Sequence, residues 1–233
     1  MSPVNQVPAL DDFHPPYHLG AVGSAIVGVW SGPPAFGSGD LGGFEPVRWG
    51  GGHVGAAVVL RYDHPPADHP VPYNEIILAY VVRRSAQWAA LPFDLVLDNA
   101  FYVEAGQRHY HLPKRLDTTL DIVVERDATG RPKHMRASGA DVAFDASLGP
   151  KSIGCAMALV SVLLRAFTSH IPVIGAASQP LLSTLIRVDP DRTTAHAARD
   201  VRLAVGGRTL RPMGSFFWEK LAVNVGIPRP VLR

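Results

Sequence analysis

The sequence predicts an α+β protein in which a mostly antiparallel, barrel-like β-sheet dominates and a few helices complete the fold. Three observations lead to this expectation. Short runs rich in Val, Ile and Leu recur along the chain, glycines and prolines punctuate the gaps between them, and long helical periodicity is scarce. At 233 residues, 47% of them hydrophobic, the chain can bury a sizeable core. No linker divides it, so we expect a single domain over residues 1–233.

The strand candidates share a short length, β-branched or aliphatic content and flanking turn residues. They are HVGAAVVLRY, EIILAYVV, FDLVLDN, HLPKRLD and TLDIVVER, with DVAFDAS as a further candidate. Residues 31–43, 49–53 and 63–72 hold clusters of glycine and proline and are predicted as turns or loops. The better helix candidates are residues 151–167 and 213–225.

Composition excludes several classes of protein. The formal net charge is +2 and the basic residues are scattered, so we expect no nucleic-acid partner. The longest apolar stretch, residues 153–164, is too short to span a bilayer, so we expect no membrane role. The first residues lack a basic region followed by an apolar core, which argues against a secretory signal. Cys155 is the single cysteine and cannot form an internal disulfide, which favours a cytoplasmic protein. It lies in an apolar setting, where we interpret it as a core residue.

Lys114 is the residue with the most unusual predicted environment. In an extended HYHLPKRLD segment, alternation places Tyr110, Leu112, Lys114 and Leu116 on one face of a strand. Lys114 would then project between two leucines toward the core, where burial disfavours an ammonium and lowers its pKa. A free amine is what attack on a carbonyl requires, and the resulting iminium is an electron sink. Arg115 adds a positive charge that acts in the same direction, although desolvation is expected to be the larger effect.

Two segments resemble the signature of the acetoacetate decarboxylase family. LDNAFYVEAGQRHYHLPKRL, residues 97–116, is similar to the stretch in which an Asp-Asn turn leads to Pro-Lys-Lys-Leu. PYNEIILAY is similar to the Tyr-x-Glu strand upstream of it. The resemblance covers about residues 72–125 and implies the fold of that family, a lysine-based mechanism and identical subunits that assemble into a homo-oligomer.

The same resemblance implies roles for individual residues. Lys114 corresponds to the Schiff-base nucleophile, Arg115 to the second lysine that activates it, and Glu75 to an active-site carboxylate that moves protons. Tyr73 and Tyr110 could line the pocket and present hydroxyls to the substrate, or could be ordinary core tyrosines.

The sequence also departs from the family in two places. The decarboxylases carry an arginine near the N-terminus that binds the substrate carboxylate, whereas residues 15–30 contain none. They also have a second acidic residue on the strand before Tyr-x-Glu, and HVGAAVVLRY has no acid before Asp63. Losing the carboxylate clamp argues against acetoacetate as substrate, unless Arg48, Arg61 or Arg108 replaces it.

Other kinds of site find little support. The histidines near 64 and 109 show no spacing of three or four converging ligands, so we expect no metal. There is no G-x-S-x-G and no G-K-[ST], which argues against a serine hydrolase and a phosphate loop. No external cofactor is expected, because a lysine imine is itself the electron sink.

The sequence therefore predicts a lysine-dependent lyase acting on a small-molecule keto acid or β-dicarbonyl compound, either as a decarboxylase or as an aldolase-dehydratase. The alternative is a non-catalytic pocket protein that binds a hydrophobic carbonyl ligand. We also expect a homo-oligomer in which exposed Phe216, Phe217 and Trp218 serve as contacts.

Overall fold

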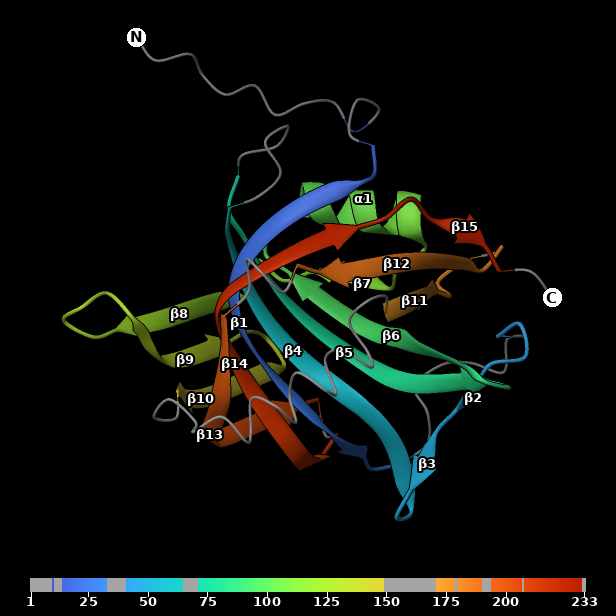
Figure 1. Cartoon of the computed structure of the whole chain (residues 1–233). Helices are drawn as coiled ribbons and strands as arrows, with labels where there is room; N and C mark the ends of the chain where they lie inside the picture. Colours follow the sequence, from blue (N-terminus) through green and yellow to red (C-terminus); the bar gives the residue numbers. More distant parts are fainter. Residues whose placement is uncertain are drawn as a thin grey trace, which may run out of the picture.

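The computed structural model describes residues 10, 14–32, 41–64, 71–148, 171–178, 180–189, 194–206 and 208–231. Within these residues the chain forms fifteen strands and one helix (Figure 1). The elements are β1 (Tyr17–Trp30), β2 (Glu45–Pro46), β3 (Arg48–Trp49), β4 (Gly52–His64), β5 (Tyr73–Arg84), β6 (Gln87–Leu97), α1 (Ala100–Tyr110), β7 (Lys114–Leu116), β8 (Asp121–Arg126), β9 (Pro132–Ser138), β10 (Val142–Leu148), β11 (Ile171–Gly175), β12 (Leu182–Val188), β13 (Thr194–Val205), β14 (Leu210–Val225) and β15 (Arg229–Pro230). The predicted α+β fold, dominated by antiparallel sheet, is confirmed.

Seven of the described strands close into a ring. The order β6-β5-β4-β1-β14 continues through pairing of β14 with β12, of β12 with β11, and of β11 with β6. All of these pairs are antiparallel except β11 with β6. Closure leaves no free edge in the ring, which removes the hydrogen-bonding surface through which edge strands aggregate. From β14, strands β13, β10, β9 and β8 continue as an antiparallel extension (Figure 1).

Alternating side chains give the sheet a core on each face. On one face, Ile76 and Leu78 of β5 pack in a cluster that includes Met135 of β9 and Phe144 of β10. On the other face, strand residues pack with Tyr102, Val103 and Ala105 of α1, so we name it the α1-covered face. Because successive strand residues point to opposite faces, one strand contributes to both cores. Each fully buried aliphatic side chain stabilises the fold by roughly 1.5–3 kcal/mol.

Most predicted strands and one predicted turn are confirmed. HVGAAVVLRY lies in β4, EIILAYVV in β5, FDLVLDN largely in β6, TLDIVVER largely in β8 and DVAFDAS largely in β10. The turn predicted at residues 49–53 joins β3 to β4, and both central residues, Gly50 and Gly51, have positive φ angles of 53° and 82°. Two successive positive φ values define the tight hairpin turn that matches the twist of antiparallel strands, and glycine adopts them without strain.

The helix predicted at residues 213–225 is wrong, because this segment lies in β14. The strand pairs with β1 over nearly its whole length and also with β13 and β12. Alternation of buried Leu221 and Val223 with more exposed neighbours is the pattern of a strand, and β-branched and aromatic residues suit it. The helix predicted at 151–167 lies outside the described residues.

The strand predicted at HLPKRLD is confirmed only over Lys114–Leu116, which form β7. The residues before this segment belong to α1, so the extended conformation expected from His109 onward is wrong at His109 and Tyr110. The Asn99 side chain accepts a hydrogen bond from the Phe101 backbone N–H at 3.0 Å and so caps the helix at its start. At its end, His111 has the left-handed conformation and the Leu112 N–H donates to the Gly106 oxygen, which terminates the helix before Pro113.

The prediction that three aromatic residues of β14 are exposed and form contacts in a homo-oligomer is wrong, because these side chains are largely buried. Phe217 is fully buried and Trp218 is 9% exposed, while Phe216 packs against the α1-covered core. The homo-oligomer itself stays a prediction. No helix in the described ranges is long and apolar enough to cross a membrane.

Candidate active site

Two neighbouring strands present a carboxylate and two tyrosines on the α1-covered face. In the register of β4 and β5, Leu60 pairs with Glu75 and Tyr62 pairs with Tyr73, so all four side chains share that face. Glu75 is only 4% exposed and Tyr62 and Tyr73 are similarly buried. A carboxylate so deeply buried needs partners for its charge, because leaving it unpaired would cost several kcal/mol.

Lys114 is the charged partner of Glu75. Its Nζ lies 2.9 Å from Glu75 Oε1, and the two side chains are only 11% and 5% exposed. β7 brings it there by pairing in parallel with the end of β6, where Leu95 is opposite Lys114 and Leu97 is opposite Leu116. Leu97 is also opposite Glu75 on β5. The sequence-predicted pair of Lys114 and Glu75 therefore meets in the structure, and the two side chains can exchange a proton directly.

Helix α1, and not a pair of leucines, buries Lys114. The predicted alternation is wrong here because Tyr110 belongs to α1, and Leu116 is 46% exposed. The lysine stem instead runs against Gly106 of α1, where an added Cβ would lie 2.2 Å from Lys114 Cδ and 2.4 Å from Cε. Gln107 of the same helix donates from Nε2 to the Lys114 carbonyl oxygen at 2.6 Å. The predicted activation of the Lys114 amine stays a prediction.

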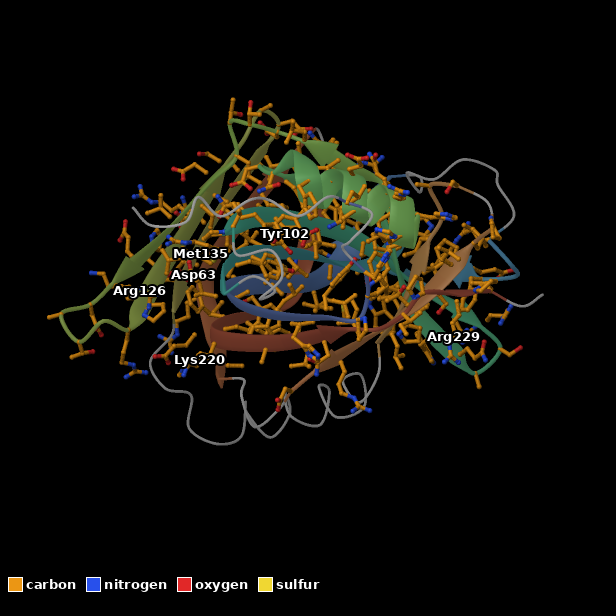
Figure 2. All side chains as sticks on the ribbon, turned by 90° about the horizontal axis from the view of Figure 1, so that it is seen from above. Asp63, Tyr102, Arg126, Met135, Lys220 and Arg229 are labelled. Atoms are coloured by element: carbon orange, nitrogen blue, oxygen red, sulfur yellow. The ribbon has the colours of Figure 1, made fainter. Side chains whose placement is uncertain are left out.

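A column of three tyrosines borders the Lys114–Glu75 pair. The rings of Tyr62 and Tyr73 stack with centroids 4.3 Å apart, and those of Tyr73 and Tyr102 with centroids 3.9 Å apart. Figure 2 labels Tyr102 in the helix that covers this face. Burial raises the pKa of the Tyr62 and Tyr73 hydroxyls well above their usual range, and the Glu75 carboxylate raises both further. These phenols therefore remain proton donors at neutral pH.

Tyr62 is a site residue that sequence reasoning missed. Its hydroxyl donates to Glu75 Oε2 at 3.1 Å, so the two oxygens of Glu75 have different partners. Tyr62 lies on β4, the strand that corresponds to the one on which the resemblance to the acetoacetate decarboxylase family predicts a second acidic residue. The available signal was the alternation of β4, which puts Tyr62 and not Asp63 on the face that Glu75 shares.

Tyr73 and Tyr110 have different surroundings. Tyr73 lies in the column beside Glu75, whereas the Tyr110 hydroxyl donates to the Gly226 carbonyl oxygen at 3.4 Å. The Tyr110 ring packs edge-on against Tyr17 with centroids 5.9 Å apart. Substrate contact by either residue stays a prediction.

The Asp98-Asn99 turn positions the two elements that border Lys114, the start of β5 and helix α1. Asp98 accepts hydrogen bonds from the backbone N–H and the side-chain amide of Asn74, at 2.9 and 2.8 Å, which fixes the start of β5 next to Glu75. Asn99 caps α1, the helix that covers Lys114. One dipeptide thus positions both sides of the site.

Arg115 points to the opposite face of β7. Its Nε donates to Asp94 Oδ1 at 2.8 Å, and its Nη2 reaches Asp94 Oδ2 at 3.0 Å and Asp141 Oδ1 at 2.8 Å. These charge-assisted hydrogen bonds raise the pKa of the guanidinium above its usual value. Arg115 therefore ties β7 to β6 and to the start of β10, and two carboxylates offset its charge.

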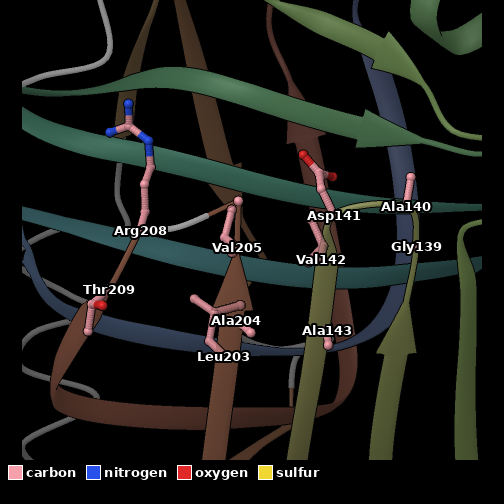
Figure 3. Close-up of a pocket in the computed structure, with 11 residues that line it drawn as sticks. Gly139, Ala140, Asp141, Val142, Ala143, Leu203, Ala204, Val205, Arg208 and Thr209 are labelled. Atoms are coloured by element: carbon pink, nitrogen blue, oxygen red, sulfur yellow. The ribbon is translucent and has the colours of Figure 1, made fainter.

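A surface hollow of about 520 Å³ lies on this opposite side, between β10 and β13 (Figure 3). Asp141, the partner of Arg115, and Arg208 stand at two sides of it in Figure 3, and alanines form part of its lining. Arg208 is held there by donating to the Tyr80 hydroxyl at 3.0 Å. Neither Lys114 nor Glu75 lines the hollow, so it is separate from the lysine site.

The arginines considered as a carboxylate clamp lie on other surfaces. Arg61 follows Leu60 on β4, so it faces away from Glu75, and its Nε pairs with Asp63 Oδ1 at 2.8 Å. Arg48 on β3 and Arg108 on α1 are exposed. The cation that the structure places against Glu75 is Lys114.

Comparison with known proteins finds likeness in structure and not in sequence. No family model matches the chain, and no curated protein matches it. An acetoacetate decarboxylase-like enzyme from Sphingomonas wittichii RW1 is 11% identical with a TM-score of 0.65, covering 99% of this chain and 98% of that one. Acetoacetate decarboxylase from Legionella pneumophila is 12% identical with a TM-score of 0.63, covering 94% and 88%.

A third similar structure is that of the enduracididine biosynthesis enzyme MppR in complex with pyruvate. It is 14% identical with a TM-score of 0.62, covering 94% of this chain and 91% of that one. Coverage of almost the full length on both sides shows that the whole architecture is shared, and not one motif. The chain therefore has the fold of acetoacetate decarboxylase and of the acetoacetate decarboxylase-like enzymes.

Proposed function

We propose that this protein is an enzyme in which Lys114 forms an imine with a keto substrate and Glu75 moves the protons. The observation that carries the proposal is the 2.9 Å contact between Lys114 Nζ and Glu75 Oε1 in an almost fully buried setting. A buried amine beside a buried carboxylate is the pair that imine chemistry needs, a nucleophile and an adjacent base. The shared fold with known enzymes supports the same conclusion.

In the proposed imine formation, Glu75 transfers a proton from the Lys114 nitrogen to the substrate oxygen twice. A lysine ammonium and a ketone give an iminium and water, so two of the three ammonium protons end on the departing oxygen. Glu75 first takes one proton from Lys114, and the free amine attacks the carbonyl carbon. The carboxylic acid returns this proton to the former carbonyl oxygen, which forms the carbinolamine. Glu75 then removes a second nitrogen proton and delivers it to the hydroxyl, which leaves as water while the C=N bond forms.

For the later steps we propose aldol-type condensation or dehydration in preference to decarboxylation. The iminium withdraws electrons from the neighbouring carbon, and in this proposal Glu75 removes a proton there, which gives an enamine that can attack an aldehyde. MppR, which shares the fold, is known in complex with pyruvate and with the condensation product of pyruvate and imidazole 4-carboxaldehyde. We therefore propose a pyruvate-like keto acid and an aldehyde as the substrate class.

Reductive trapping tests the imine. The protein is incubated with pyruvate, acetoacetate or a larger keto acid, reduced with sodium cyanoborohydride, and examined by intact mass and peptide mapping. We expect one stable adduct per chain, mapped to Lys114. A protein that binds a carbonyl ligand without chemistry would show no adduct with any of these compounds, which would favour the non-catalytic alternative.

Gly106→Ala should displace Lys114 without harming the helix. An added Cβ would lie 2.2 Å from Lys114 Cδ, so the lysine stem must move away from Glu75. Alanine favours a helix over glycine by about 1 kcal/mol, which offsets part of the strain. A displacement of about 1 Å can lower a rate on the order of 100-fold. We expect the rate of reductive trapping to fall on the order of 100-fold, while circular dichroism shows that α1 is intact.

Glu104→Ala, at an exposed position on the same helix, is the matched control. Equal trapping rates in both variants would contradict the role of Gly106.

Arg115→Gln should raise the pH at which the imine forms, while Arg115→Lys should change it little. Removing the guanidinium leaves the Asp94 and Asp141 carboxylates without their shared cation, and the added negative potential favours an ammonium at the adjacent Lys114. Lysine keeps the charge although it loses the two-pronged contact. Trapping rates measured across pH check this. A pH profile that is the same in all three proteins would leave Arg115 a purely structural tie.

A further inference from the structure

The two oxygens of Glu75 are held by chemically different groups. Oε1 lies 2.9 Å from Lys114 Nζ, and Oε2 accepts a hydrogen bond from the Tyr62 hydroxyl at 3.1 Å. A carboxylate that exchanges protons through one oxygen and is anchored through the other has a fixed orientation. The imine steps above need this orientation, because Glu75 must face Lys114 both when it takes and when it returns each proton.

Tyr62 is itself held in place by its neighbours. It is 4% exposed, and its ring stacks on Tyr73, which stacks in turn on Tyr102 of α1. The Tyr73 hydroxyl also hydrogen-bonds to Tyr62. With Tyr73 supplying a donor to the Tyr62 oxygen, the single proton of Tyr62 is left for Glu75. The column therefore leaves Tyr62 little freedom to rotate away from Oε2.

We propose that Tyr62 is a positioning residue that anchors Glu75 Oε2 and thereby routes proton exchange with Lys114 through Oε1. This inference rests on the proposed imine chemistry. A phenol suits the task because it stays protonated and donates to the carboxylate throughout the working pH range. A second carboxylate at this position would add a negative charge beside Glu75 and would compete for its proton. Tyr62 supplies an anchor and adds no charge.

Tyr62→Phe tests the anchor while keeping the stacked ring. Without the phenol, Oε2 is a buried acceptor with no donor, and the carboxylate form of Glu75 is disfavoured. We expect cyanoborohydride trapping of pyruvate to slow by about 10-fold to 100-fold. We also expect the acid limb of the pH profile to move to higher pH, because Glu75 then holds its proton more tightly. Tyr73→Phe, which removes only the second link, should shift both quantities in the same direction by less.

A double-mutant comparison separates anchoring from a direct role. If Tyr62 acts only through Glu75, Tyr62→Phe added to Glu75→Gln should slow trapping by no more than about 2-fold beyond Glu75→Gln alone. Tyr80→Phe is the matched control: Tyr80 is a buried tyrosine on the neighbouring strand β5, on the opposite face of the sheet, and its hydroxyl accepts from Arg208. It should lower the melting temperature without changing the pH profile.

The possible failures can be told apart. Wild-type protein that gives no adduct with any keto acid overturns the proposed function and the anchor together. Wild-type trapping with an unchanged rate and pH profile in Tyr62→Phe overturns the anchor alone. Additive effects of Tyr62→Phe and Glu75→Gln would also overturn it, since they would show that Tyr62 acts independently of Glu75.

Discussion

Replacing Lys114 by alanine should abolish the reductive adduct with every keto acid. The amine is the atom that bonds to the substrate carbon, so no other group can substitute for it in the same position. We expect turnover to fall on the order of 10⁴-fold or more, as when a nucleophile is removed from an enzyme. The measurement is intact mass after cyanoborohydride reduction, followed by peptide mapping.

Circular dichroism separates this loss from unfolding. The check is needed because removing the amine leaves the buried Glu75 carboxylate without its charged partner, with the Tyr62 hydroxyl as a remaining donor. Lys133→Ala, at an exposed position of β9, is the matched control and should retain the adduct. An adduct that persists at another lysine in Lys114→Ala would move the nucleophile elsewhere and contradict the mechanism.

Acetoacetate should be decarboxylated slowly or not at all, whereas a pyruvate and aldehyde pair should condense. Decarboxylation requires the breaking bond to be aligned with the iminium, and a two-pronged arginine contact to the carboxylate provides both binding and alignment. Residues 15–30 contain no arginine, and Arg61 faces away from Glu75 and pairs with Asp63. We expect carbon dioxide release from acetoacetate to be at least about 100-fold slower than formation of the unsaturated condensation product.

The comparison uses one protein preparation and two assays. Carbon dioxide release is followed with acetoacetate, and product absorbance is followed with pyruvate and imidazole 4-carboxaldehyde. Lys114→Ala serves as the blank in both. Efficient decarboxylation would contradict the expected chemistry and would point to an arginine that reaches the substrate, which single Arg48→Ala, Arg61→Ala and Arg108→Ala variants would identify.

The sequence by itself determined the sheet-rich fold and the two central charged residues. Alternation and β-branched content marked β4, β5 and β8, because a strand with one buried face repeats every second residue. Lys114 and Glu75 stood out because a charged residue in an apolar run, within a recognisable motif, is unusual. Both features are local, so a short window of sequence contains them.

Helix α1 and strand β14 show where local pattern misleads. Residues 213–225 carry enough helix-forming residues to suggest a helix, yet pairing with β1 and β13 makes them a strand. The segment HYHLPKRLD suggests a strand from His109 onward, yet His109 and Tyr110 belong to a helix that begins at the Asn99 cap and packs through Tyr102 and Ala105. Tertiary contacts decide both cases, because propensities differ by less than the free energy of burying a face.

Only the tertiary structure decided how the site is assembled. The register of β4 with β5 brings Tyr62 to Glu75, and the parallel pairing of β7 with β6 brings Lys114 to the same carboxylate. Gly106 lets α1 lie against the lysine stem, and Asp94 and Asp141 draw Arg115 to the opposite face. Except for Gly106 and Lys114, the residues in contact are at least 13 positions apart in the chain. Their geometry depends on strand order and register, which no local pattern of residues specifies.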